Sequence, residues 1–135
     1  MPIRDPLHVL QFGPMWMLSA ITGTESFAAI DREVFAEILD NVIHRTPAEA
    51  REVLQTVADA GPDLFLDFEL DDRPLVSGIR HIAEVLSAGD SDFAADYKLA
   101  LLRIGIGIAK ARGPYGRQVS AENEQQLLLV AELLC

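Results

Sequence analysis

The segment from residue 91 to residue 112 is the sequence feature that most constrains the fold. Apolar residues recur there every three or four positions and line one helical face: Phe93, Tyr97, Leu101, Ile104 and Ile108. Leu99, Leu102 and Ile106 cover the other faces. A helix that is apolar nearly all round is buried at the centre of a protein. Other helices must therefore surround this one, and Gly105 and Ala109, four residues apart, would let one approach closely.

Helix start and stop signals predict about five more helices, so the expected fold is an all-α, single-domain helical bundle. Proline, glycine and cap residues bound these segments at residues 6–22, 32–46, 47–60, 74–88 and 121–134. Gly13-Pro14 predicts a kink or break in the first segment. Five N-caps are expected along the chain, at Asp5, Asp31, Thr46, Ser91 and Ser120. In the last helix the expected apolar stripe is Leu127, Leu128, Ala131 and Leu134.

Residues 63–72 have no clear helical period. Leu66, Phe68 and Leu70 alternate with Asp67 and Glu69, a pattern typical of a strand. No second strand is available to pair with it, so a short helix or an ordered loop is favoured. The acidic run of Asp67, Glu69, Asp71 and Asp72 is interpreted as a solvated face.

The first and last thirds of the chain follow the same order of helix, glycine, short loop, cap and second helix. Gly23 corresponds to Gly113, and Ile30–Glu33 corresponds to Val119–Glu122. This order predicts two pseudo-repeated helical hairpins, at about residues 6–45 and 92–135, with residues 46–90 as a helical insertion.

Composition excludes several classes of protein. The 135 residues carry 21 acids against 11 lysines and arginines, a net charge of −10 that disfavours nucleic-acid binding. One cysteine, Cys135, forms no internal disulfide. Residues 1–6 lack signal-peptide features, and the longest apolar run, 99–109, is interrupted by Arg103 and too short for a membrane span. We therefore expect a cytoplasmic protein. Its high hydrophobic share, 50%, would also fit a buried interface in a homodimer.

Three stretches of the second half resemble the TerB-like family, which is named after bacterial tellurite resistance. They are Tyr97–Gly105, Ile108–Ala111 and Val119–Glu122. The resemblance implies an all-helical fold of two related hairpins and a non-enzymatic role in stress-response systems near the membrane, with peripheral membrane association. It also implies metal binding through acidic loops. Two acidic positions of the family pattern are Val34 and Asn123 in this chain.

Candidate ligands for a divalent cation lie beside the two expected caps. They are Glu25, Asp31, Glu33, Glu122 and Glu124. Calcium-like cations take six or more oxygen ligands, so backbone or water oxygens would have to complete such a site. The alternative is that these acids only complement the dipoles at helix N-termini. The sequence predicts no other cofactor.

A basic spot follows the central helix and contains Lys110, Arg112, Tyr115 and Arg117. It could bind an acidic partner or a phosphate, or it could complement the C-terminal dipole of the helix. No catalytic motif is present: His8, His44 and His81 lack ligand spacing, and Gly105-Ile106-Gly107 lacks the third glycine of a dinucleotide loop.

Three functions therefore stay open. The first is a TerB-like accessory or scaffold protein that binds a protein partner or a second copy of itself. The second is a metal-responsive module that uses the acidic cap residues. The third is a small-ligand carrier or enzyme with a pocket inside the bundle.

Overall fold

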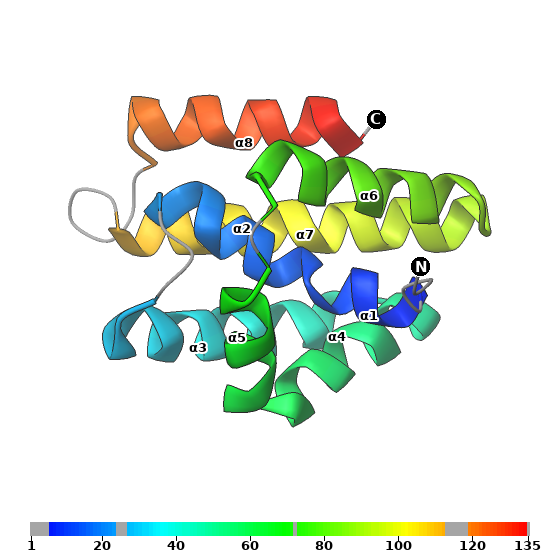
Figure 1. Cartoon of the computed structure of the whole chain (residues 1–135), viewed down its shortest axis with the longest axis horizontal. Helices are drawn as coiled ribbons and strands as arrows, with labels where there is room; N and C mark the ends of the chain where they lie inside the picture. The colour runs from blue at the N-terminus through cyan, green and yellow to red at the C-terminus, as the bar shows by residue number, and fades with distance from the viewer. Residues whose placement is uncertain (1–5, 24–26, 72, 113–118, 135) are drawn as a thin grey trace.

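The computed structural model describes residues 6–23, 27–71, 73–112 and 119–134, and every regular element in these ranges is a helix (Figure 1). The helices are α1 (Pro6–Gln11), α2 (Gly13–Thr22), α3 (Ala29–Arg45), α4 (Ala48–Ala60), α5 (Pro62–Glu69), α6 (Leu75–Ser87), α7 (Ser91–Arg112) and α8 (Ala121–Leu134). The all-α prediction is confirmed. The helices exceed the six expected because the first segment is divided in two and residues 62–69 form one of their own.

Helix α7 lies at the centre of the molecule. It packs against α2, α3, α4, α6 and α8. In Figure 1 it runs between α6 and α8 on one side and α3, α4 and α5 on the other. Its expected apolar face is buried, with Tyr97, Leu101 and Ile104 fully inaccessible to solvent. The prediction that α7 is buried all round is wrong, because Leu99 and Ile106 are 48% and 40% exposed. The exposed Arg103 lies between them on the same helical face.

The break expected at Gly13-Pro14 is confirmed: α1 ends at Gln11 and α2 begins at Gly13. Pro14 has no N–H to donate to the carbonyl of Leu10, four residues before it. The buried hydroxyl of Tyr97, on α7, donates to that carbonyl instead. A side chain on Gly13 would overlap the Tyr97 hydroxyl, so glycine is needed there. The contact of α7 with α1 and α2 therefore accommodates the break between these two helices.

Of the predicted N-caps, Ser120 is confirmed and Asp31 is wrong. The Ser120 hydroxyl accepts the N–H of Asn123 at 3.2 Å. Asp5, a further predicted N-cap, lies outside the described residues. Helix α3 starts three residues earlier than expected, with Ala28 as its N-cap, and Asp31 lies in its first turn. A first-turn acid still interacts favourably with the helix dipole, although it does not cap the helix.

Thr46 and Ser91 are not N-caps either. The Thr46 hydroxyl donates to the carbonyl of Val42 at 2.6 Å, so it closes α3, and α4 begins after Pro47. Ser91 is already helical, and the carboxylate of Asp90 accepts the N–H of Phe93 at 3.4 Å. The Thr46 hydroxyl therefore serves the helix before it, and the Asp90 carboxylate takes the place that Ser91 was expected to fill at the start of α7.

Residues 62–69 form a short helix, as favoured over a strand. Leu64, Phe65 and Phe68 are buried on one side of α5, so the apparent alternation with acids does not set the structure. In α8 the expected stripe is partly wrong: Leu134 is buried, but Leu128 is 60% exposed and Val130 takes its place in the core. Leu127 still packs against the core, so the buried face of α8 contains Leu127, Val130 and Leu134.

The acidic run after α5 is not wholly solvated. Asp67 and Glu69 are exposed, but Asp71 is buried, and Asp72 lies outside the described residues. Arg73 donates to the Asp71 carboxylate through Nε at 3.0 Å and through Nη2 at 2.8 Å. Its Nη1 lies 2.9 Å from Nδ1 of His81, on α6. Arg73, only two residues after Asp71, therefore links the end of α5 to α6. The prediction of a solvated face missed this arrangement because it did not consider that a neighbouring arginine could pair with the acid.

An aromatic core joins α2, α3 and α5. The Trp16 and Phe68 rings meet edge to face at 4.7 Å, and Phe65 contacts Phe27 and Phe35 at 5.8 Å and 5.6 Å. Such edge-to-face pairs add to the stabilisation from burial alone.

No helix in the described ranges combines the length and apolarity that a membrane crossing needs.

Candidate functional site

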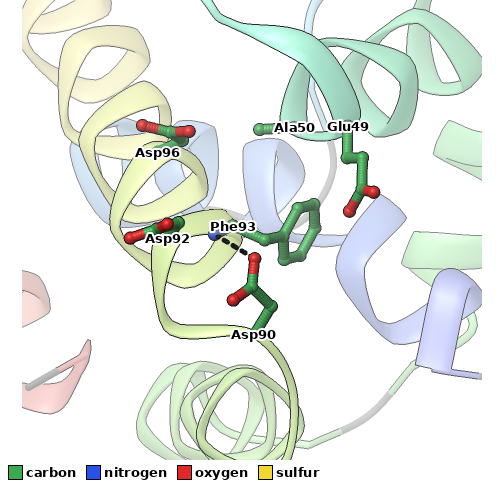
Figure 2. Close-up of a pocket in the computed structure, with 6 residues that line it drawn as sticks. All are labelled: Glu49, Ala50, Asp90, Asp92, Phe93 and Asp96. Carbon is green, nitrogen blue, oxygen red and sulfur yellow. Dashed lines mark hydrogen bonds between the residues drawn. The ribbon is translucent and has the colours of Figure 1, made fainter.

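A surface groove lies where α1, α4 and the start of α7 meet. It consists of two adjoining hollows of about 210 and 360 Å³ that share Glu49 and Phe93. We call it the acidic groove and define it by its lining residues: Leu7, Glu49, Ala50, Glu52, Val53, Thr56, Asp90, Asp92, Phe93 and Asp96. Five of these ten residues are acids and none is basic. Figure 2 shows the first hollow.

Helix starts position most of the acids. Glu49 lies in the first turn of α4 and Asp92 in the first turn of α7, where the helix dipole favours negative charge. Asp96 follows Asp92 by one turn, so both lie on the same side of α7. Asp90 precedes the helix and accepts the N–H of Phe93. The local sequence therefore stabilises acids where α4 and α7 meet.

The groove has a fixed aromatic floor. Phe93 is partly buried, and its ring stacks on that of Tyr97 with centroids 6.0 Å apart and an interplanar angle of 21°. Burial raises the pKa of Tyr97 far above its ordinary value, so its hydroxyl stays protonated and donates to Leu10. On the opposite wall, Gln11 donates to the Thr56 hydroxyl at 3.1 Å and so ties α1 to α4. The groove is therefore formed before any ligand binds.

The carboxylates do not converge on one point. Figure 2 shows Glu49 on one side of Phe93, Asp92 and Asp96 on the other, and Asp90 beside the Phe93 N–H. In the described residues, no three histidines, cysteines or acids are grouped so that they could hold a metal ion. Carboxylates spread round an aromatic ring suit several separate cationic groups, one of which can lie over the ring. Lysine and arginine side chains of a peptide have this chemistry.

The predicted cation ligands are distributed over two helix starts. Asp31 and Glu33 lie in the first two turns of α3, and Glu122 and Glu124 lie in the first turn of α8. Glu25 lies outside the described residues. In Figure 1, α3 and α8 begin at the same end of the molecule, with α2 and α7 between them. The structure therefore does not bring these four described acids together.

The predicted basic spot is described only in part. Lys110 is exposed near the end of α7, and Arg112 is the last residue of that helix. Tyr115 and Arg117 lie outside the described residues. The anion or acidic-partner site that these four residues would form stays a prediction.

Sequence reasoning missed the acidic groove because its acids come from two distant segments. Glu49 and Glu52 lie one turn apart on α4, and Asp92 and Asp96 lie one turn apart on α7. These two spacings are visible in the sequence, yet each describes an ordinary solvated helix face. Only the packing of α4 on α7 joins them beside Phe93. In comparisons with known proteins, no family model, no curated protein and no solved structure matches this chain.

Proposed function

We propose that this chain is a non-enzymatic, TerB-like accessory protein that binds a basic stretch of a protein partner in its acidic groove. The observation that carries the proposal is the set of five acids that line the two adjoining hollows at Phe93. Such a groove offers charge to lysines and arginines and an apolar floor to the side chains between them. The resemblance to a family of accessory proteins supports the same kind of role.

The partner segment follows from the two hollows. The hollow at Asp90, Asp92 and Asp96 suits cationic side chains, and one cation can lie over Phe93. The hollow at Leu7 and Val53 suits an aliphatic side chain, with Glu49 and Glu52 at its edge. Exposed ion pairs contribute about 0.2–1 kcal/mol each, so several must act together. We therefore expect a segment that alternates basic and aliphatic residues, bound more weakly as salt rises.

The arrangement of the helices supports the proposed two-hairpin repeat. Helices α2 and α7 pack against each other, α3 packs on α7, and α8 packs on α2. The second helix of each proposed hairpin thus contacts the first helix of the other, as a pseudo-two-fold axis between α2 and α7 requires. On this basis we propose that the chain belongs to the tellurite-resistance-related family. We also propose that the protein is cytoplasmic, as expected in the sequence analysis.

A second copy of the chain is the other candidate partner. Leu99 and Ile106 lie two turns apart on α7 and are 48% and 40% exposed. Exposed apolar side chains on a central helix favour a contact with another protein surface. Sedimentation equilibrium over a tenfold concentration range distinguishes a dimer from a monomer.

The test of the proposal is calorimetric titration with a six-residue peptide of four lysines and two leucines. The groove variant combines Glu49→Gln, Asp92→Asn and Asp96→Asn. The matched control combines Glu122→Gln, Glu124→Gln and Glu132→Gln, which removes the same charge from exposed positions on α8. We expect the groove variant to bind about tenfold more weakly than the unsubstituted protein, and the control to bind within about threefold of it.

Two results would overturn the proposal. Equal loss of affinity in both variants would mean that total charge, not the groove, attracts the peptide. Full affinity in the groove variant would mean that the peptide binds elsewhere. An acidic peptide of the same length serves as the negative control and is expected not to bind.

A further inference from the structure

A second cavity, of about 210 Å³, shares only α4 with the acidic groove, and different residues of that helix line it. It is enclosed by α2, α3, α4 and α5, and its lining is mostly apolar: Met15, Phe35, Ala36, Leu39, Asp40, Val57, Ala58, Gly61 and Phe65. Five of these side chains belong to the buried core. A cavity of about 150 Å³ lined by such residues stays dry and holds benzene, so this one has room for a ring with a short side chain.

The wall of the cavity is held in place by contacts on several sides. Phe65 packs edge to face against Phe27 and Phe35, and the Arg32 guanidinium lies 4.9 Å from its ring centroid. Arg32 in turn donates to Glu69 at 3.2 Å, which ties α3 to α5. Met15 is flexible enough to adjust to the shape of a ligand. The aromatic wall is therefore formed in advance, which lowers the cost of binding.

The mouth of the cavity is small and negative. Asp40 is the one charged residue among the lining residues, and its side chain is 74% exposed. Ala36 and Ala58 are exposed and leave the opening unobstructed. Gly61 is the C-cap of α4 and also the N-cap of α5, so the opposite partial charges of these two helix ends offset each other there. A ligand that enters the cavity ring first would leave its polar end next to the Asp40 carboxylate, which supplies the negative charge at the mouth.

We propose that this cavity binds a small organic amine whose aromatic or branched alkyl part fills the space beside Phe35 and Phe65. Its ammonium group lies at the mouth, next to the Asp40 carboxylate. The apolar wall selects for the ring, and the carboxylate selects for the positive charge. This site goes beyond the proposed peptide-binding role, since it shares no lining residue with the acidic groove.

The test compares three probes of similar shape: 2-phenylethylamine, 2-phenylethanol and phenylacetate. Each is titrated into the protein while methyl NMR signals of Met15, Leu39 and Val57 are followed. We expect the amine to shift these signals with a dissociation constant on the order of 1 mM, the alcohol to bind about fivefold more weakly, and phenylacetate more weakly still. In Asp40→Asn the amine is expected to lose its advantage over the alcohol.

A second pair of variants tests the location. Ala58→Leu places a larger side chain in the mouth. It is expected to weaken amine binding at least tenfold, because the leucine side chain takes up part of the volume that the ligand needs. Ala36→Leu does the same from α3 and serves if the first variant fails to fold. Ala95→Leu, at an exposed position of α7, is the matched control and leaves binding unchanged.

Three results would overturn the inference: no methyl shifts with any probe, equal affinity for phenylacetate and the amine, or unchanged amine binding in both mouth variants. The groove variant of the peptide experiment is included as well. It keeps full amine affinity if the two sites are independent, and loss of amine binding there would show that the amine binds in the acidic groove instead.

Discussion

At the scale of single residues, Tyr97 replaces a backbone hydrogen bond that the chain itself removes. Pro14 cannot donate to the Leu10 carbonyl, and the Tyr97 hydroxyl does so from α7. Gly13 leaves the space that this hydroxyl occupies. A buried carbonyl without a partner costs about 1–3 kcal/mol, so the three residues depend on one another.

We predict that Tyr97→Phe lowers the free energy of unfolding by about 1–3 kcal/mol, because Leu10 loses its donor in a buried place. In a Pro14→Ala background the loss should be smaller by about 1 kcal/mol, since the new backbone N–H can donate to Leu10. Urea melts of the four proteins of this double-mutant cycle measure the coupling. Additive effects, within about 0.5 kcal/mol, would mean that Tyr97 does not compensate for the proline.

The same hydroxyl predicts a loss of stability in alkali. Burial raises the pKa of Tyr97 above its ordinary value of about 10, so above that pH the unfolded chain releases a proton that the folded chain retains. The free energy of unfolding should then fall by about 1.4 kcal/mol per pH unit on account of this group. Urea melts between about pH 9.5 and 11.5 test this. Tyr97→Phe should remove that part of the slope, and an unchanged slope would refute the assignment.

At the scale of helices, Gly78 allows α6 to lie against α2. A side chain added at Gly78 would overlap the indole ring of Trp16, which is itself fixed against Phe68. Gly105 plays a similar part on α7, between Met17 and Leu127, as expected from its spacing to Ala109. Glycines thus set the spacing of the central helices, where the core has no room for a methyl group.

We predict that Gly78→Ala lowers the free energy of unfolding by about 1–3 kcal/mol, because overpacking at the rigid Trp16 ring outweighs the better helix propensity of alanine. Gly89→Ala is the control: a methyl group there would lie 3.9 Å from its nearest neighbours. Thermal unfolding followed by circular dichroism compares the two. A stable Gly78→Ala protein would show that α6 can move away from Trp16 at little cost.

The helices themselves could be predicted from the sequence, but most of the residues that cap them could not. Apolar spacing and the Gly-Pro pairs placed α4 and α7 close to their observed bounds. Caps failed at Asp31, Thr46 and Ser91, because a hydroxyl or carboxylate near a helix end can serve either of two helices or none. The choice depends on backbone geometry, which single-residue preferences do not contain.

The acidic groove could not be predicted from the sequence, for a different reason. Its acids occupy ordinary solvated helix positions, and only tertiary packing sets Glu49 next to Phe93. The burial of Asp71 was not predicted from the sequence either. Its partner Arg73 pairs with the Asp71 carboxylate and so makes a buried charge tolerable at this position. Periodicity reports which face of a helix is buried. It does not report which two helix faces meet.

At the scale of the whole molecule, negative charge dominates the surface. The chain has a net charge of −10, and five carboxylates gather in the acidic groove alone. The ion pairs Arg32–Glu69 and Arg73–Asp71 each use one acid and one base, so they leave this excess of negative charge unchanged. Like charges on a compact protein repel and lower its stability, and dissolved salt screens this repulsion.

We therefore predict that the melting temperature rises by a few degrees between about 0.02 and 0.5 M sodium chloride, as the Debye length falls well below the spacing of the groove acids. Differential scanning calorimetry measures the shift. Chloride is preferred to sulfate, which strengthens hydrophobic burial by itself. A fall in melting temperature would show that the two ion pairs contribute more than the net repulsion.

The interruption between α1 and α2 also has a consequence for how the protein opens. A six-residue helix is far too short to be stable alone, so α1 persists only while it is docked on α4 and α6. Because no continuous backbone ladder joins it to α2, α1 can detach as a cooperative unit of its own while the remaining helices stay folded. In native-state hydrogen exchange its amides should exchange by such sub-global opening, ahead of those of α7. Each opening would remove Leu7 from the wall of the acidic groove, and so couple the lifetime of a bound peptide to the local stability of the first helix.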